Sequence, residues 1–523
     1  MYRRRIWASA LALAVVATGL FAVNRSVGAT TRVPAQFVAK LYSEALGRMP
    51  DRGGWTFYLN VLSTNGCTTA MVAELVRSFY TSTEFLNLPY GNAQRVLTLY
   101  RGALNREPDQ PGLDFWRSQL DTGALTWSQV VADFMKGTEL AGLTPTICTG
   151  SSYYYGTQVA PTLPVSGAGF AGGSGAQLQA ALDDAPVGGT VFLAQGAVVR
   201  LDTMLVIPAG RTLATQGQPG PNAYASQGRL VRTNSFAAPA VRLNSGARLL
   251  NVWVDGQRGA YTNFTLDAIN VQLMGGTGTE VSGSKIANSR GWSSLQVFGT
   301  AENLPCGGAI VSGNLITAYS SEHTRRDDSA RWTDGLSVAC EHTTVENNGI
   351  IDATDVAIVI FRAHPETQTS LVRGNQILSA GNSAYGAISL DGGVDKHTTP
   401  DFTGLAVTGN AFWTGPTTHF DIGLAVGVRP WYAGHADTGT GASVTGNTTN
   451  GLTATVSTGI AVSGMYHATV RGNDLHLSIQ ATGACPRVAF GIDNQGYAAG
   501  GTFDPAGTPV SFLNQWGGGC IGH

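Results

Sequence analysis

The stretch Leu371-Val372-Arg373-Gly374-Asn375-Gln376-Ile377-Leu378 sets a Gly-Asn pair between two short apolar runs. The same kind of turn returns at Gly283-Ser284, Gly313-Asn314, Asn348-Gly349, Gly409-Asn410, Gly446-Asn447 and Gly472-Asn473. Counted at positions 284, 314, 348, 375, 410, 447 and 473, the steps are 30, 34, 27, 35, 37 and 26 residues. Such long steps indicate a repeat in which each passage of the chain adds one coil.

Gly and Asn suit these corners because both tolerate the left-handed backbone of a sharp turn between strands. Asn side chains in the same corner of successive coils can also stack as a ladder. A β-sandwich would instead show hairpin turns about every 8 to 12 residues. The sequence therefore predicts a mainly β fold, a right-handed parallel β-helix of about nine or ten coils.

The start of this region carries a second pattern. A short amphipathic segment, residues 178–182, is followed by two apolar runs at 188–193 and 207–213. This pattern resembles the N-terminal cap of the pectate-lyase-like superfamily, in which a helix plugs the open end of the stacked strands. Without a cap, the first coil would expose unpaired strand edges and an apolar end to water.

Upstream, residues 35–145 contain a duplication. Leu41-Tyr42, Arg48, Pro50-Asp51, Gly54 and Phe57-Tyr58 align with Leu99-Tyr100, Arg106, Pro108-Asp109, Gly112 and Phe115-Trp116, each pair 58 residues apart. The apolar spacing predicts a small all-α domain with three helices in each copy, and the Arg and Asp residues are expected to form structural caps. The pattern LYxxALxRxPDxxGxxFW resembles a helical domain family of unknown function that recurs in secreted bacterial and surface-layer proteins, which implies attachment or spacing.

The N-terminus has the features of an export signal. Three arginines precede an apolar run at 6–23, and Val27-Gly28-Ala29 supplies small residues for a signal peptidase. An uncleaved anchor is the alternative, because this run just reaches a spanning length of about 18 residues. We predict a secreted or cell-surface protein with no membrane span after cleavage, divided into signal peptide (1–29), helical tandem-repeat domain (35–147), linker (148–165) and β-helix (166–523).

The six cysteines are expected to form disulfides, because export leads to an oxidising compartment and no CxxC spacing indicates zinc. Their order suggests the pairs Cys67 with Cys148, Cys306 with Cys340 and Cys485 with Cys520, among 15 pairings that six cysteines allow.

The charge composition limits the classes of binding partner that the protein can have. Charged residues are 13% of the chain, hydrophobic residues are 43%, and the formal net charge is −2. This composition excludes charge-driven disorder and gives no electrostatic case for nucleic acid or a membrane surface. We expect a monomer with no nucleotide, haem or flavin cofactor.

Loops between the predicted strands cluster on one side, and in repeat proteins such loops mark the working face. They contain Arg362 with His364, Asp391 with Lys396, and Arg429 with Trp431 and Tyr432; a further loop at 321–332 holds six charged residues in twelve and includes His323, Arg325 and Arg326. The aromatic pair would stack on sugar faces or anchor its loop by burial. The histidines would transfer protons or lie in ordinary surface turns.

Thr333-Asp334-Gly335 and Thr354-Asp355-Val356 repeat one motif a single coil apart. Adjacent coils lie about 4.8 Å apart, so the two carboxylates are expected to be neighbours. Their repulsion raises the proton affinity of one, which makes a general acid beside a base or nucleophile. A separation of about 5 Å suits a retaining glycosidase, whereas inversion needs about 6.5 to 9.5 Å and would recruit Asp391. The alternative is that each Asp caps a turn.

This pair resembles the TDG and DD segments of the polygalacturonase family of β-helix glycoside hydrolases, and by that resemblance Asp334 and Asp355 would be catalytic. The match is partial. Thr354 stands where the family has the first Asp of its pair, residues 382–386 hold no Gly-His-Gly, and no Arg-x-Lys lies in the expected place. The resemblance therefore fits a divergent glycosidase better than a polygalacturonase proper.

Two other functions fit the same scaffold. A polysaccharide lyase would need a base and cations that neutralise a uronic carboxylate, with calcium held by Asp327, Asp328 and Asp391. A non-catalytic glycan-binding or adhesion protein, anchored by its helical repeat, is equally compatible with the fold.

We predict a polysaccharide-cleaving enzyme, a hydrolase more than a lyase, without a metal unless it is a lyase. The predicted catalytic residues are Asp334, Asp355, Asp391 and Arg362; the predicted substrate-binding residues are His323, Arg325, Arg326, His364, Lys396, Arg429, Trp431 and Tyr432.

Overall fold

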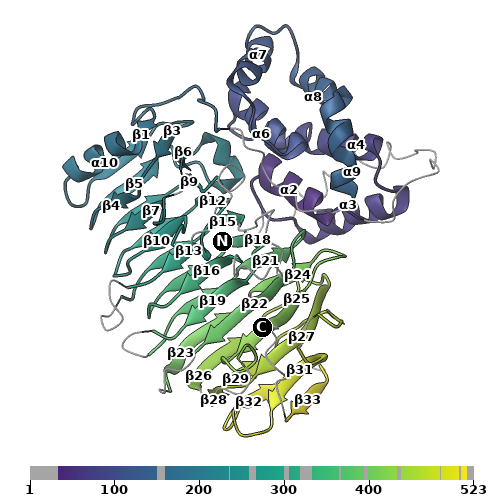
Figure 1. The fold of residues 1–523 in the computed structure, drawn as a ribbon, viewed down its shortest axis with the longest axis vertical. Helices are drawn as coiled ribbons and strands as arrows, with labels where there is room; N and C mark the ends of the chain where they lie inside the picture. Colours follow the sequence, from purple (N-terminus) through teal and green to yellow (C-terminus); the bar gives the residue numbers. More distant parts are fainter. Residues whose placement is uncertain are drawn as a thin grey trace, which may run out of the picture.

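The computed structural model describes residues 33–149 and 159–514, apart from 235, 258–266, 300–305, 318–331, 364–366, 394–398, 433–437, 483–484 and 506–507. A helical region precedes three parallel sheets, which confirms the predicted fold class (Figure 1). The predicted signal peptide lies outside the described residues. Among the helices that are described, none combines the length and apolar character needed to cross a membrane.

Each copy in the helical region forms four helices. The first copy contains α2 (Ala35–Ala45), α3 (Arg52–Asn65), α4 (Thr69–Tyr80) and α5 (Thr83–Leu86); the second contains α6 (Asn92–Leu104), α7 (Gln110–Asp121), α8 (Trp127–Lys136) and α9 (Thr138–Thr149). The prediction of three helices per copy is wrong because a further helix starts at each Thr-Glu pair. In the first copy, Ser82 caps this helix by accepting a hydrogen bond from the Phe85 N–H at 3.1 Å.

Both copies contain the same capping network. Asp51 accepts a hydrogen bond from the Gly54 N–H at 2.8 Å and pairs with Arg48 at 3.2 Å. Arg48 also bonds at 2.9 Å to Glu84, in the first turn of α5. The second copy repeats this network with Arg106, Asp109, Gly112 and Glu139. The predicted structural role of the Arg and Asp residues is confirmed.

Three sheets surround one apolar core. The first has nine strands: β1 (Gly173–Ser174), β3 (Val198–Leu201), β6 (Gly228–Arg232), β9 (Val252–Asp255), β12 (Lys285–Ala287), β15 (Leu315–Thr317), β18 (Gly349–Ile351), β21 (Gln376–Ser379) and β24 (Ala411–Thr414). The core is built from Leu, Val and Ile side chains that alternate inward along the strands.

The second sheet, which carries the predicted acid pair, has twelve strands. They are β4 (Leu205–Ile207), β7 (Val241–Leu243), β10 (Val271–Leu273), β13 (Ser293–Val297), β16 (Asp334–Val338), β19 (Val356–Phe361), β22 (Ala384–Asp391), β25 (Phe420–Val426), β27 (Ala454–Val462), β31 (Val488–Asp493), β33 (Val510–Leu513) and, beside β27, β30 (Leu477–Ile479).

The third sheet also has twelve strands. They are β2 (Thr190–Leu193), β5 (Thr212–Thr215), β8 (Arg248–Leu250), β11 (Glu280–Ser282), β14 (Ile310–Ser312), β17 (Thr344–Glu346), β20 (Leu371–Arg373), β23 (Asp401–Thr408), β26 (Gly439–Thr445), β29 (Thr469–Arg471), β32 (Thr502–Asp504) and, beside β26, β28 (Met465–Tyr466). The first sheet has nine strands, whereas the other two each run through eleven successive strands, so the described solenoid has slightly more coils than the nine or ten expected.

The predicted asparagine ladder forms at the corner between the third and first sheets. Asn314, Asn348, Asn375, Asn410, Asn447 and Asn473 stack, each Nδ2 donating to the Oδ1 of the next residue at 2.9 to 3.0 Å. Each preceding residue has a positive φ, as at Gly374 with 64° and Asn347 with 56°. The sequence step thus measures one coil.

Helix α10 (Gly175–Asp184) covers the N-terminal end of the solenoid (Figure 1). Leu178 and Leu182 are fully buried in the core. Gln179 accepts from the Val206 N–H at 2.8 Å and donates to its carbonyl oxygen at 2.9 Å, which satisfies the free edge of β4. The predicted cap is confirmed.

The helical region packs along the first sheet (Figure 1). Trp253 of β9, Ile351 of β18 and Trp413 of β24 join one apolar cluster with α2 and α6. The described end of the predicted linker is also fixed, because the Thr162 N–H donates to the Gln110 side chain at 2.9 Å. The two parts of the chain therefore share an extended interface.

A buried charged network crosses this interface. Glu44 of α2 accepts from Arg101 of α6 at 2.9 Å and from Lys285 of β12 at 2.8 Å. Arg229 of β6 bonds to Glu107 at 2.8 Å and to Asp255 of β9 at 2.5 Å. These side chains are at most 3% exposed, so each carboxylate has a cation in the same dry interior.

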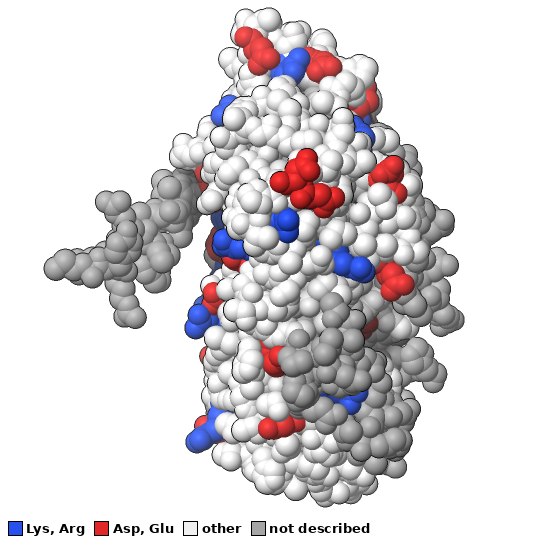
Figure 2. All heavy atoms as spheres, turned by 90° about the vertical axis from the view of Figure 1, so that its left-hand side faces the viewer, with Lys and Arg blue, Asp and Glu red and all other residues white. Residues whose placement is uncertain are grey.

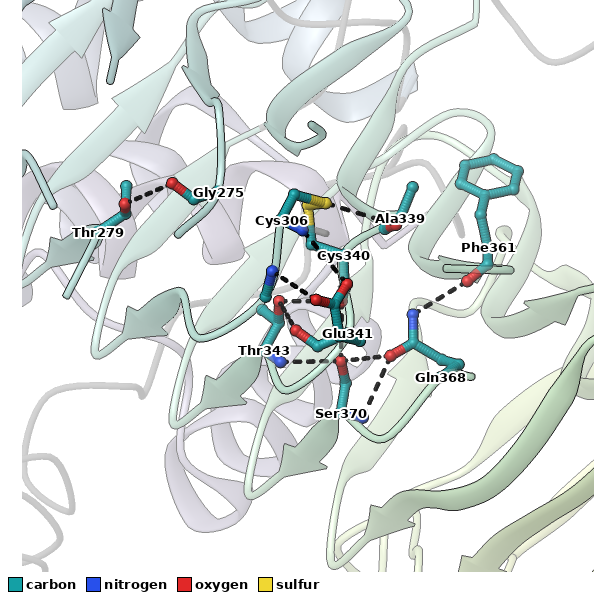
Figure 3. The surroundings of a disulfide bond; sticks show 11 residues. Gly275, Thr279, Cys306, Ala339, Cys340, Glu341, Thr343, Phe361, Gln368 and Ser370 are labelled. Carbon is teal, nitrogen blue, oxygen red and sulfur yellow. Dashed lines mark hydrogen bonds between the residues drawn. A yellow bond between two sulfur atoms is a disulfide. The ribbon is translucent and has the colours of Figure 1, made fainter. Parts of the chain in front are cut away.

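The disulfides Cys67–Cys148 and Cys306–Cys340 form as predicted, with Cα–Cα distances of 5.5 and 5.2 Å. Cys485 is also disulfide-bonded, and its predicted partner Cys520 lies outside the described residues. Figure 3 shows the second disulfide beside Glu341, which accepts from the Gly307 N–H at 2.9 Å. This corner follows the second sheet, so the bond joins consecutive coils next to the ends of β13 and β16.

Candidate active site

The predicted acid pair lies where two neighbouring strands of the second sheet begin. Asp334 is the first residue of β16, and Asp355 directly precedes β19. Leu336 pairs with Ile358, a register that sets Asp334 beside Val356. The Thr residue of each motif joins the two coils, since the Thr333 N–H donates to the Thr354 hydroxyl at 2.9 Å.

Asp334 is 3% exposed. Its Oδ1 accepts from the Val356 N–H at 3.1 Å, and its Oδ2 contacts the Ser337 hydroxyl at 2.8 Å. Burial raises the pKa of Asp334 to about 7 against these two contacts, and the charge of Asp391 adds to the rise. This carboxyl group therefore titrates near neutral pH.

The other two predicted acids, Asp355 and Asp391, are linked electrostatically to Asp334. Burial, followed by the charge of Asp334, raises the pKa of Asp355 well above its ordinary value. Asp391 ends β22, opposite Phe361 of β19. After burial, the charges of Asp391, Asp355 and Asp334 raise the pKa of Tyr432. Three carboxyl groups and one phenol thus share one electrostatic environment.

The two aromatic residues of the loop after β25 differ in their surroundings. Trp431 is 4% exposed and donates from Nε1 to the Ser389 hydroxyl at 2.7 Å. Its ring lies over Gly386, where a Cβ atom would come within 3.2 Å of two ring carbons. Tyr432 is 39% exposed. Burial of Trp431 favours its role as a loop anchor and leaves Tyr432 as the accessible ring.

Further aromatic residues border the site and are absent from the predicted set. Trp332 meets Tyr385 edge to face with ring centroids 5.5 Å apart. Trp292, Phe298 and Phe361 form a partly exposed trio whose ring centroids lie 5.8 to 6.5 Å apart. The signal that could have found them is their position at or next to the ends of β13, β16 and β19, which are neighbouring strands of the second sheet.

Of the predicted site arginines, Arg362 and Arg429 lie in the described part of the chain, and their surroundings differ. The Arg429 guanidinium lies 3.5 Å from the Tyr497 ring centroid and 3.9 Å from Asp493, at the β31 end of the sheet. Its charge is therefore partly balanced within the fold. Arg362 follows β19, and its backbone N–H donates to the backbone carbonyl oxygen of Asp391 at 2.9 Å. This bond places Arg362 beside the third acid.

The remaining predicted residues, His323, Arg325, Arg326, His364 and Lys396, lie outside the described residues, as do Asp327 and Asp328. Within the part of the chain that is described, His, Cys, Asp and Glu form no group with the geometry of a metal site. Figure 2 shows one face of the molecule, on which basic and acidic side chains are mixed and neither sign gathers in an extended patch.

The helical region matches the family described as Domain of unknown function (DUF4214) twice, over residues 24–89 and 76–144. The tandem duplication is thereby confirmed. No curated protein matches the chain.

Solved structures similar to this chain include enzymes on parallel β-helices. One is an endo-xylogalacturonan hydrolase from Aspergillus tubingensis, with 15% identity and a TM-score of 0.40, covering 66% of this chain and 94% of that one. Another is endopolygalacturonase I from Stereum purpureum, with 15% identity and a TM-score of 0.39, covering 65% and 100%. An alginate lyase from Paenibacillus sp. str. FPU-7 has 14% identity and a TM-score of 0.31, covering 59% and 99%.

Proposed function

We propose that this protein is an extracellular glycoside hydrolase that cleaves a polysaccharide with the pair Asp334 and Asp355. The observation that carries the proposal is that Asp334, which is buried, and Asp355, which is partly buried, lie on adjacent coils and both have raised pKa values. A pair that holds a proton at neutral pH can protonate the leaving oxygen of a glycosidic bond. Disulfides on both parts of the chain support an oxidising compartment.

The chemistry divides between the two acids. One protonated carboxyl group acts as the general acid, and the other, ionised, attacks the anomeric carbon or activates a water molecule. Asp391, at the far end of β22, adds a third carboxyl group whose charge contributes to the raised pKa of Asp334. Tyr432 and the trio Trp292, Phe298 and Phe361 present rings on which sugar faces can stack.

The test is cleavage of a panel of neutral and uronic polysaccharides by the mature chain and its Asp334→Asn variant, with and without calcium. Asn preserves the size of the side chain and removes the transferable proton. The matched control is Asp401→Asn, because the Asp401 side chain accepts a turn hydrogen bond from the Thr403 N–H at 2.8 Å and lies on the third sheet, away from the acid pair. New reducing ends that are lost in Asp334→Asn and kept in Asp401→Asn support the proposal.

Three results would contradict it. Unsaturated sugar products would indicate a lyase and move attention to Arg362 and Lys396. Unchanged cleavage by Asp334→Asn would remove the acid pair from the mechanism. Retention of a glycan without any cleavage would favour the non-catalytic binding protein.

A further inference from the structure

Three contacts beside Asp334 form a chain of hydroxyl groups. Ser293 begins β13 and pairs with Asp334 on the neighbouring strand. Ser337 lies three residues after Asp334 in β16. The Ser293 Oγ lies 2.8 Å from the Leu295 carbonyl oxygen and 2.9 Å from the Ser337 Oγ. The Ser337 Oγ lies 2.8 Å from Asp334 Oδ2. Both serines are fully buried, so the chain is shielded from water.

The protons in this chain can be counted. A carbonyl oxygen only accepts, so the single proton of Ser293 goes to Leu295. The contact between the serines then needs the single proton of Ser337. No hydroxyl proton is left for the contact between Ser337 and Asp334. All three contacts are hydrogen bonds only when Asp334 is protonated on Oδ2 and donates to Ser337.

We propose that Ser293 is a positioning residue that draws the Ser337 proton away from Asp334, so that Asp334 carries its own proton and serves as the acid of the pair. The other carboxyl oxygen fits this arrangement, since Oδ1 accepts from the Val356 N–H as the carbonyl oxygen of a neutral carboxyl group does. The catalytic half of this inference rests on the proposed function, whereas the position of the proton does not.

The titratable groups around Asp334 favour the same protonation state. They are Asp355 before β19, Asp391 at the end of β22 and Tyr432 after β25, and all three are acids. Any charge on them disfavours a charged Asp334. Burial acts in the same direction, and together they raise the pKa of Asp334.

The test is Ser293→Ala. Without its acceptor, Ser337 turns its proton to Asp334 and stabilises the carboxylate, so the pKa of Asp334 falls by about one pH unit, the size expected of one hydrogen bond. The readout is the melting temperature as a function of pH. A carboxyl group with a raised folded pKa stabilises the fold fully below its unfolded pKa and loses that contribution as pH rises to the folded pKa. In Ser293→Ala this loss should therefore be smaller and complete at a lower pH.

An unchanged or higher pKa in Ser293→Ala would overturn the inference, because Ser337 would then already donate to Asp334. The shift should vanish in the Asp334→Asn and Ser337→Ala backgrounds, since Ser293 acts only through those side chains. If Ser293→Ala fails to fold, Ser293→Cys keeps a weaker acceptor and should give a smaller shift in the same direction.

A matched control exists on the third sheet. The Ser282 hydroxyl contacts Glu280 at 2.7 Å and the Ser312 hydroxyl at 2.9 Å, but Glu280 is paired with Arg248 at 2.6 Å. Ser282→Ala should leave the melting profile in place. In the active enzyme, the alkaline limb of kcat/KM should move to lower pH in Ser293→Ala. A thermal shift without any cleavage would keep the proton assignment and reject the proposed function.

Discussion

Two groups of buried carboxylates lie on different sheets of the same solenoid and behave in opposite ways. At the interface with the helical region, burial alone would raise the pKa of Asp255, but Arg229 and Arg101 beside it lower that pKa. On the second sheet, burial raises the pKa of Asp334, and its neighbours are further acids.

The difference shows how neighbouring charges set the pKa of a buried acid. Both groups have left water, which penalises the charged form. At the interface, ion pairs offset the cost of burying the charges, because Glu44, Glu107 and Asp255 each contact a buried cation. The acid pair instead has raised pKa values, and we propose that it keeps a proton for transfer. The cation, and not the depth of burial, decides which role a carboxylate takes.

The largest effect should come from removing the second acid. Asp355→Asn is expected to lower kcat/KM by about 10²- to 10⁴-fold, the contribution of one acid–base group. The melting temperature at neutral pH should stay the same or rise, because the variant removes a carboxyl group that is costly to ionise at this position. Reducing-end assays beside thermal unfolding measure both; wild-type activity in this variant would show that Asp355 is a turn residue.

Breaking the interface network should cost stability without touching the chemistry. Arg229→Met keeps most of the side-chain volume and leaves Glu107 and Asp255 buried with one cation fewer. We expect a loss of about 3 to 5 kcal/mol in the free energy of unfolding, measured by urea denaturation. A variant as stable as the wild type would mean that the network sets the docking geometry and not its strength.

The pH dependence should separate the two groups. The raised pKa of Asp334 makes its stabilising contribution complete below the unfolded value of about 4 and lost as pH rises through about 7. The lowered pKa of Asp255 works in reverse, with stability present above about 4 and lost as pH falls below it. Melting curves should therefore peak in mildly acidic buffer, and Asp334→Asn should flatten only the neutral side. An identical profile in this variant would contradict the assignment.

The smallest effect is expected for a solvated ion pair. Arg373 and Glu346 lie 2.7 Å apart on the third sheet, with side chains 54% and 23% exposed. Arg373→Ala should change the free energy of unfolding by less than about 1 kcal/mol, and added salt should remove the difference. A loss as large as that of Arg229→Met would show that exposure does not explain the comparison.

Much of the fold was predictable because its signals are local. Gly374 and Asn375 mark a corner that only a few residue types tolerate, and its recurrence sets the coil length. The Thr-Asp repeat likewise placed Asp334 and Asp355 at neighbouring strand starts. The proton chain through Ser293 was not predictable, because it depends on which residues the register sets side by side.

Other features depend on contacts between distant parts of the chain. Arg229 and Glu107 are 122 residues apart in sequence, and nothing near either residue indicates the other. The sequence allowed two interpretations of Trp431, and its burial and its bond to Ser389 favour the anchor. The fourth helix of each copy was missed because Thr83-Glu84 follows α4 after a two-residue gap, too short to separate two helices by spacing.

The helical region also changes how the solenoid behaves as a mechanical object. A stack of coils can bend where neighbouring coils slide past one another. Here the helical region packs along one side of the stack, from β9 to β24, and should resist such bending. This packing reaches the coil of the acid pair, since Gln36 of α2 donates to Asp352 at 3.3 Å, and Asp352 in turn accepts from the Gly381 N–H of the next coil at 2.9 Å. Three residues after Asp352 comes Asp355. Bending at this point would alter the spacing of the two acids, so we expect the contact of α2 with the first sheet to help keep that spacing constant.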